Sequence, residues 1–376
     1  MGSRICLTAK NAKVLRKERE VALCRTVQPT LRKVSAFFAV NVLLLFWLSG
    51  PVIAQFPKDS VSERMLLYQR NDGGWPQPGG DPINYKRELT PAQQQTLIAE
   101  KSKLDATIDD QSTTREINYL IASFGQTKND DYRKAAERGI TYLLSAQNAA
   151  GGWPQFYPDS SSYRGQITYN DQAMIDVLWV MDHVATGTDG FNVVSKSLRD
   201  QAKKAVKQGI QCILKTQYRQ NGKLTAWCAQ HDRYTLQPAK ARTFELPSLS
   251  GNESVGIVQF LMHIDNPSPA VKQAIQAAVT WFESVKLRGI AVKTINDPNQ
   301  PKGRDRIVVS DPTSILWARF YDLDTNTPFF CGRDSIKKDK LADIENERRV
   351  GYAYYGTWPA KLLSADYPNW VKKWGK

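Results

Sequence analysis

Aspartates stand at the starts of two predicted helices, where their carboxylates could bind a cation. Asp109 and Asp110 precede one helix, and Asp171 precedes another. An isolated Asp at such a position usually caps the free backbone amides of the helix. If the two helices open onto one cleft, however, the three carboxylates form a cluster of oxygen ligands without His or Cys. Such a cluster suits a hard cation such as Ca²⁺.

Cationic residues are concentrated in two further segments that lack helical periodicity. The first contains Tyr234, Lys240 and Arg242, and the second places Arg319 and Arg333 around an aromatic stretch. Guanidinium groups bind carboxylates through paired hydrogen bonds. The second segment is therefore either a salt-bridged structural element or a clamp for an acidic ligand. For the first, a solvated basic loop is the simplest interpretation.

A recurring helix and tryptophan turn predicts the elements that position these residues. Gly-Gly-Trp-Pro-Gln occurs at residues 73–77 and 151–155, and a degenerate copy ends at Trp227. In each unit the glycines let the chain reverse after a helix, and the Trp covers the helix end. Other amphipathic segments alternate with these units. We therefore predict a mainly α fold, a toroid (α/α barrel) of paired helices with irregular loops and few short strands, such as Ile307-Val308-Val309.

The first 54 residues differ in composition from the rest. Half of the net charge of +14 lies before Val34, and an uncharged segment with an apolar run from Ala36 to Leu48 follows. Small side chains up to Ala54 are typical of a signal peptidase site. We predict a signal peptide with a long basic leader over residues 1–54, a single domain over residues 55–376, and a secreted or periplasmic protein. A signal anchor is the alternative.

The composition of residues 55–376 favours a globular protein with an acidic partner. Hydrophobic residues make up 41% and charged residues 23% of the chain, which is close to the globular average. The remaining positive charge is spread along the chain, which does not favour nucleic acid. Three cysteines allow at most one disulfide, and three His in all make a zinc site unexpected. No membrane contact is expected after signal cleavage, and we expect a monomer.

Residues 55–376 resemble the pectate lyases of polysaccharide lyase family 10. The resemblance is carried by the Gly-Gly-Trp-Pro-Gln repeats and by residues 107–114, 167–174, 231–250 and 317–356. It implies a helical toroid with a long open cleft, in which Ca²⁺ assists the β-elimination of polygalacturonate.

The resemblance also implies roles for individual residues. Arg242 is expected to be the catalytic base, and Asp171 is expected to be a direct calcium ligand. Asp109 matches a second cleft aspartate of the family and is a further expected metal ligand. Asp110 and Gln111 depart from the family pattern, which has Asn and Gly there, and we expect the extra carboxylate of Asp110 to act as a metal ligand too. The substrate contacts expected are Asp109, Tyr234, Lys240, Arg319 and Arg333.

The chemistry of a uronate polymer agrees with these residue types. The C5 proton lies next to a carboxylate, and cations on that carboxylate stabilise the charge that develops as the proton leaves. An arginine base requires a lowered pKa, because guanidinium is normally protonated. Neighbouring cations and a dry site would lower that pKa.

Two other functions are consistent with the residues alone. A glycoside hydrolase could use Asp109 and Asp171 as its carboxylate pair. A polysaccharide-binding protein without activity could use the tryptophans as platforms. Only a lyase would leave unsaturated chain ends that absorb in the ultraviolet.

Overall fold

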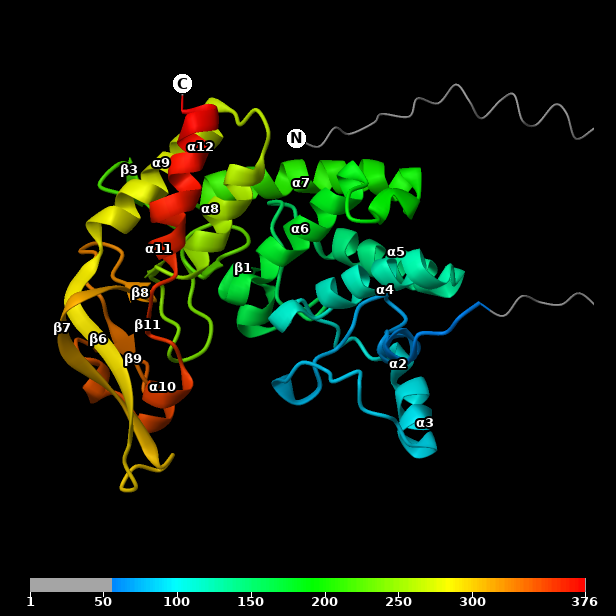
Figure 1. The fold of residues 1–376 in the computed structure, drawn as a ribbon, viewed down its shortest axis with the longest axis horizontal. Helices are drawn as coiled ribbons and strands as arrows, with labels where there is room; N and C mark the ends of the chain where they lie inside the picture. Colours follow the sequence, from blue (N-terminus) through cyan, green and yellow to red (C-terminus); the bar gives the residue numbers. More distant parts are fainter. Residues whose placement is uncertain (1–55, 376) are drawn as a thin grey trace, which may run out of the picture. The chain divides into compact units, whose positions relative to one another are not determined.

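The fold is known from a computed structural model, which describes residues 56–375 (Figure 1). The predicted signal peptide and the cleavage site after Ala54 lie outside the described residues. Within residues 56–375, no helix combines the length and apolar character needed to span a membrane.

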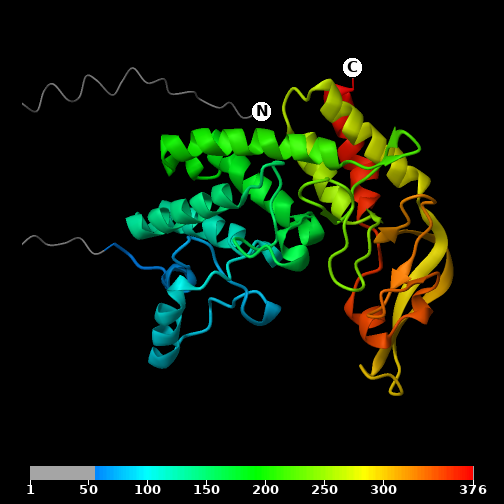
Figure 2. The same cartoon turned by 180° about the vertical axis from the view of Figure 1, so that it is seen from behind.

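Two layers of helices confirm the predicted toroid of paired helices. The outer layer contains α2, α5, α7 and α9, the inner layer contains α4, α6 and α8, and neighbouring helices within and between the layers are in contact (Figures 1 and 2). The helices are α2 (Ser60–Tyr68), α3 (Pro91–Ala99), α4 (Thr114–Thr127), α5 (Asp130–Ala146), α6 (Ala173–Thr186), α7 (Lys196–Thr216), α8 (Glu253–His263), α9 (Pro269–Ser284), α10 (Asn346–Gly351), α11 (Pro359–Lys361) and α12 (Tyr367–Trp374).

Each outer helix packs against an inner helix along a continuous core. In α6 an apolar stripe at three- and four-residue spacing is fully buried, formed by Met174, Val177, Leu178 and Met181. Burial of such side chains contributes about 1.5–3 kcal/mol each. The inner helices are therefore held in fixed positions, and so are the turns at which they begin.

The tryptophan turns close the ends of the outer helices, as the sequence predicted. Each indole is buried and donates a hydrogen bond to a carbonyl near the end of the preceding outer helix. A fourth tryptophan, Trp317, does the same after α9 and was not predicted as part of the repeat. The bonds run from Trp75 to Met65 (2.8 Å), Trp153 to Leu143 (2.7 Å), Trp227 to Ile213 (2.8 Å) and Trp317 to Phe282 (2.8 Å).

A glutamine at the end of three outer helices ties each repeat to the next. Its side-chain amide donates to a carbonyl of its own turn and to a carbonyl of the following outer helix. The bonds run from Gln69 to Gly73 and Ala135, from Gln147 to Gly151 and Ala205, and from Gln217 to Thr225 and Ala274, all at 2.8–2.9 Å. Ala135, Ala205 and Ala274 are therefore equivalent positions of α5, α7 and α9.

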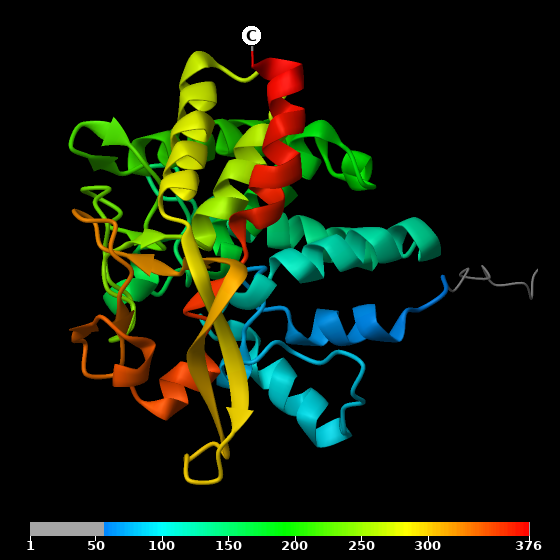
Figure 3. The same cartoon turned by 60° about the vertical axis from the view of Figure 1, so that its left-hand side comes forward.

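Most strands are two residues long, but one hairpin is extended. The predicted strand at Ile307-Val308-Val309 lies inside β7, which pairs with β6 and, near its end, with β11 (Figure 3). The strands are β1 (Ile167–Thr168), β2 (Arg219–Gln220), β3 (Lys223–Leu224), β4 (Gln230–His231), β5 (Leu249–Ser250), β6 (Leu287–Asn296), β7 (Arg304–Ala318), β8 (Phe320–Tyr321), β9 (Phe330–Cys331), β10 (Lys337–Lys338) and β11 (Tyr355–Gly356).

A second, smaller apolar cluster supports the loops beside the toroid. It is aromatic and includes Phe244, Phe320, Phe330 and Tyr354. The three cysteines of residues 56–375 are buried and free, so no disulfide contributes to this part of the chain.

Candidate active site

Neither Asp109 nor Asp171 caps a helix, so the helix-cap interpretation is wrong for both. The N-cap residues of α4 and α6 are Thr113 and Gln172, and neither makes a side-chain capping bond. In both cases the chain makes a short turn before the helix begins. The aspartates lie in these turns and are left available for another role.

The two turns hold an aspartate in left-handed backbone conformation. Asp110 lies in η3 (Asp109–Gln111) with φ 43°, and Asp171 lies in η5 (Asn170–Gln172) with φ 47°. Such a conformation costs a non-glycine residue roughly 1–3 kcal/mol and is typical of functional sites. Because the turns occupy equivalent places in successive repeats, Asp110 is the structural counterpart of Asp171.

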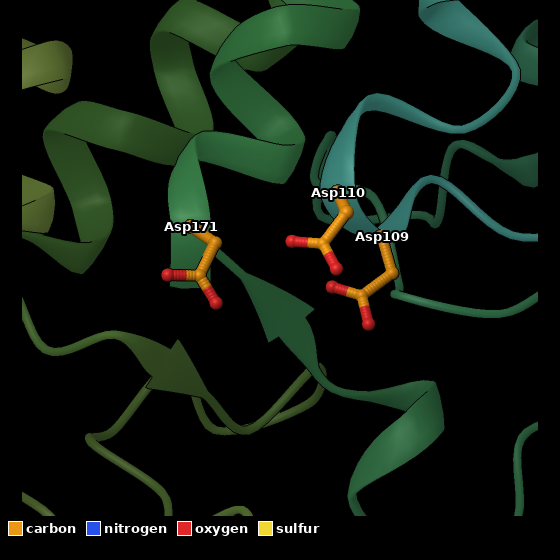
Figure 4. Close-up of side chains that lie close together, drawn as sticks. All are labelled: Asp109, Asp110 and Asp171. Atoms are coloured by element: carbon orange, nitrogen blue, oxygen red, sulfur yellow. The ribbon is translucent and has the colours of Figure 1, made fainter. Parts of the chain in front are cut away.

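The carboxylates of Asp109, Asp110 and Asp171 form one cluster. Each offers an oxygen, and these atoms lie within 4.8 Å of one another (Figure 4). The prediction that the two helix starts bring their carboxylates together is therefore confirmed. The three negative charges repel one another. Burial is the largest cause that raises the pKa of Asp109 to about 6, and the charges of Asp110 and Asp171 add to it.

Two glutamines complete the surroundings of the cluster, and the sequence analysis missed both. Gln77 donates a hydrogen bond of 2.8 Å to Asp110, and the side chain of Gln155 is hydrogen-bonded to Asp109. Each is the last residue of a Gly-Gly-Trp-Pro-Gln repeat. The repeat could therefore have indicated these two glutamines, but it was interpreted as a structural motif only.

A buried ion pair fixes Asp171. The guanidinium of Arg319 donates to Asp171 at 2.8 Å and to the buried carboxylate of Glu253, and it lies over the ring of Tyr352. The side chain of Arg319 is 6% exposed. Arg319 therefore supports Asp171 from below the surface, and its role as a substrate contact stays a prediction.

The cluster lines a cleft of about 490 Å³. Arg242 lines the same cleft, as do Tyr163 and Arg164, which the sequence analysis did not single out. Arg164 is paired with Asp159 at 2.6 Å. The other lining residues are Pro76, Gln77, Pro78, Gly80, Leu104, Asp105, Gln155, Phe156 and Asp159. The cleft thus combines a carboxylate cluster with cations at one place.

Arg242 is held by Glu245, three residues further along the chain. Its Nε and one Nη donate to the two carboxylate oxygens of Glu245 at 2.8 and 2.6 Å. This hydrogen-bonded pairing raises the pKa of Arg242 above its ordinary value. The expectation that its surroundings lower the pKa is therefore not met in the free chain, because the nearest charge is a carboxylate.

The remaining predicted substrate contacts lie outside the lining of this cleft. Arg333 is exposed and paired with Glu347 at 3.1 Å, and Arg242 and Arg333 both lie over the ring of Phe244. Tyr234 is 80% exposed, and Lys240 is exposed on the same loop. Their roles as substrate contacts stay predictions.

His231 organises the loop that carries these side chains. Its Nε2 accepts from the backbone of Cys228 at 3.2 Å, so its Nδ1 carries the proton and donates to Leu236 at 3.0 Å. Burial lowers the pKa of His231 to about 4. The ring is neutral and structural, and it fixes the turn from which Tyr234 projects.

Comparison with known proteins agrees with this arrangement. The chain matches the pectic acid lyase family over residues 69–363. A family 10 polysaccharide lyase from Cellvibrio cellulosa shares 35% sequence identity with it, over 84% of this chain and 92% of that chain, with a TM-score of 0.72. No curated protein matches the chain significantly.

A second solved structure of that lyase contains a sugar acid. It is an aspartate-to-alanine variant in complex with trigalacturonic acid, with 34% identity over 84% of this chain and 93% of that chain and a TM-score of 0.72. Because the family match spans most of the described residues and the structural match covers the same fold, the chain belongs to the pectic acid lyases, family 10 of the polysaccharide lyases, and it is a pectate lyase.

Proposed function

We propose that the enzyme cleaves polygalacturonate by calcium-assisted β-elimination in the cleft, with Arg242 as the base. The observation that carries the proposal is that the carboxylate cluster and Arg242 line one cleft. The complex of a similar lyase with trigalacturonic acid supports the choice of substrate. We further propose export after cleavage behind Ala54, so that the first residue of the exported chain is Gln55.

The residues of the cluster fit a calcium ion. Asp109, Asp110 and Asp171 offer oxygen atoms only, close enough together to share one cation. Burial and, after it, the carboxylates of Asp110 and Asp171 raise the pKa of Asp109, and a cation bound between them would favour its ionised form. When bound, the ion would stabilise negative charge on the substrate carboxylate beside the breaking bond.

The elimination needs one proton acceptor and one leaving oxygen. Arg242 takes the C5 proton, and the electron pair of the broken C–H bond forms the C4–C5 double bond. The glycosidic oxygen on C4 leaves with its bond electrons and takes a proton from water. Only neutral guanidine can accept the proton, and Glu245 opposes that form. Arg242 therefore acts after its side chain, which is 44% exposed, has left Glu245. The rate should rise with pH, because at pH values below the pKa of Arg242 each increase of one pH unit raises the neutral fraction about tenfold.

The proposal predicts an ultraviolet-absorbing product that depends on calcium. Polygalacturonate treated with the protein and Ca²⁺ should gain absorbance from 4,5-unsaturated ends, and excess chelator should abolish the gain. Added Ca²⁺ should restore it. Reducing ends formed without this absorbance would indicate hydrolysis and contradict the proposed chemistry.

Calcium binding should weaken in acid. Asp109 must be ionised to bind the cation, and its pKa of about 6 makes protons compete below that pH. Affinity measured by calorimetry should be nearly constant above pH 7 and should fall about tenfold per unit well below pH 6. Asp109→Asn should weaken binding at pH 8 and remove this slope. An unchanged slope in that variant would assign the proton to another group.

A further inference from the structure

The outward face of α7 is strongly basic. The helix carries Lys203, Lys204, Lys207 and Lys215 on its exposed side, at spacings that place them on one face. None of these four lysines has an ion-pair or hydrogen-bond partner within residues 56–375. Figure 2 shows α7 along an edge of the molecule, and none of these lysines lines the catalytic cleft.

A surface groove runs beside these lysines. Its volume is about 460 Å³, and it lies between α7 and the tryptophan turn that follows α5. The lining contains three of the lysines and no acidic residue. It is formed by Ala149, Ala150, Gly151, Lys204, Lys207, Gln208, Gln211 and Lys215. A cation-lined groove without acids attracts an extended polyanion.

The repeat shows that this charge is not required by the fold. Counting from the equivalent Ala135, Ala205 and Ala274, the place of Lys207 is taken by Glu137 in α5 and by Gln276 in α9. The equivalent groove of the preceding repeat contains Asp72 and Glu137 beside Lys134 and Arg138, so its charges are mixed rather than all positive.

Of the other two lysines of the groove, Lys215 differs from its equivalents in residue type, whereas Lys204 differs from its α5 equivalent only in its ion pairing. The place of Lys215 is taken by Ser145 and Ser284. Lys134, the α5 equivalent of Lys204, is paired with Asp130 at 3.0 Å, whereas Lys204 is unpaired. The repeat in α5 therefore forms without free lysines at these positions, so those of α7 are not required by the architecture.

We propose that Lys204, Lys207 and Lys215 form a second binding surface for polygalacturonate, outside the cleft. The inference rests on the lyase function, whose substrate is a chain of carboxylates long enough to reach two places on one enzyme. A membrane surface fits less well, because the apolar face of α7 is buried in the toroid rather than free to insert. Single-stranded nucleic acid fits less well, because the groove offers no aromatic ring for base stacking.

The test compares two variants that lose the same charge. Lys204→Gln, Lys207→Gln and Lys215→Gln are combined in one protein. The control combines Lys223→Gln, Lys302→Gln and Lys372→Gln, which are exposed lysines on other elements. Binding of polygalacturonate is measured in EDTA, and kcat and KM are measured on the polymer with Ca²⁺. Losing three exposed contacts should weaken binding about fivefold to tenfold.

The expected result is a loss of polymer affinity and a raised KM in the α7 variant alone, with kcat unchanged in both. Equal losses of polymer affinity in the two variants would show that only the net charge of the protein matters, and would overturn the proposal. Tighter, equally lysine-dependent binding of single-stranded DNA or phosphatidylserine vesicles would overturn the choice of partner. Absence of ultraviolet-absorbing product from the wild type would instead contradict the proposed cleavage chemistry, and binding in EDTA would still decide the role of α7.

Discussion

Arg242→Lys should lower kcat on polygalacturonate by roughly 10²–10⁴-fold, the range over which a positioned base contributes to catalysis. Lysine keeps the charge but replaces the planar guanidinium with a compact ammonium of different reach and pKa. It also cannot make the paired contact with Glu245. The measurement is kcat and KM at several pH values, with thermal unfolding as a check on folding.

Glu245→Gln is the matched control for the role of Arg242. Glu245 raises the pKa of Arg242, so its removal should lower that pKa and move the rise of kcat/KM to lower pH. A residue that only bound substrate would show weaker affinity without this displacement. A near-native kcat in folded Arg242→Lys would show that Arg242 is not the base. Lys240 or Arg233 in the same loop would then be the candidate base to test.

Arg319→Met should destabilise the protein by about 3–5 kcal/mol, because it leaves a buried carboxylate without its partner. Glu253 is fully buried and bound by Arg319, and Asp171 loses its 2.8 Å contact at the same time. The free energy of unfolding is measured in denaturant, and calcium affinity is measured on the folded protein. We expect calcium affinity to fall as well, because removing a residue that holds a metal ligand typically lowers metal affinity tenfold to a hundredfold.

Arg333→Met separates this structural role from substrate binding. Arg333 is exposed, so stability should change by less than about 0.5 kcal/mol. The combination of Arg319→Met with Glu253→Gln should recover part of the lost stability, because the orphaned charge is gone. If Arg319→Met raised KM without any loss of stability, the guanidinium would be a substrate ligand after all.

The features predicted correctly from sequence are those set by local residues. Glycine, proline and tryptophan fix the turn after each outer helix, so the repeat and the helical fold could be read directly. The carboxylate cluster was predicted for a similar reason, since equivalent turns of neighbouring repeats face one cleft. The left-handed turn itself was missed, and with it the equivalence of Asp110 and Asp171.

Partners that lie far apart in the chain could not be predicted. Arg319 meets Glu253 and Asp171, which precede it by 66 and 148 residues. Spacing carries no information about such pairs, because they form only when the helices pack. Glu245 is different, since it lies three residues from Arg242 and was visible as an acid beside a cation. Its effect on the pKa was missed because the family resemblance directed attention to the base alone.

The glutamine contacts between repeats determine how the toroid comes apart. Gln69, Gln147 and Gln217 each join one outer helix to the next, so cohesion passes between neighbours as it does in a solenoid. Among the described outer helices, α2 and α9 are each tied by such a glutamine on one side only, whereas α5 and α7 are tied on both. We expect fraying to begin at the ends of this series, and its first repeat contributes Asp109 and Asp110, while Asp171 belongs to the second. Opening of the first repeat would separate the acidic cluster, and a cation shared between the two repeats would oppose that opening.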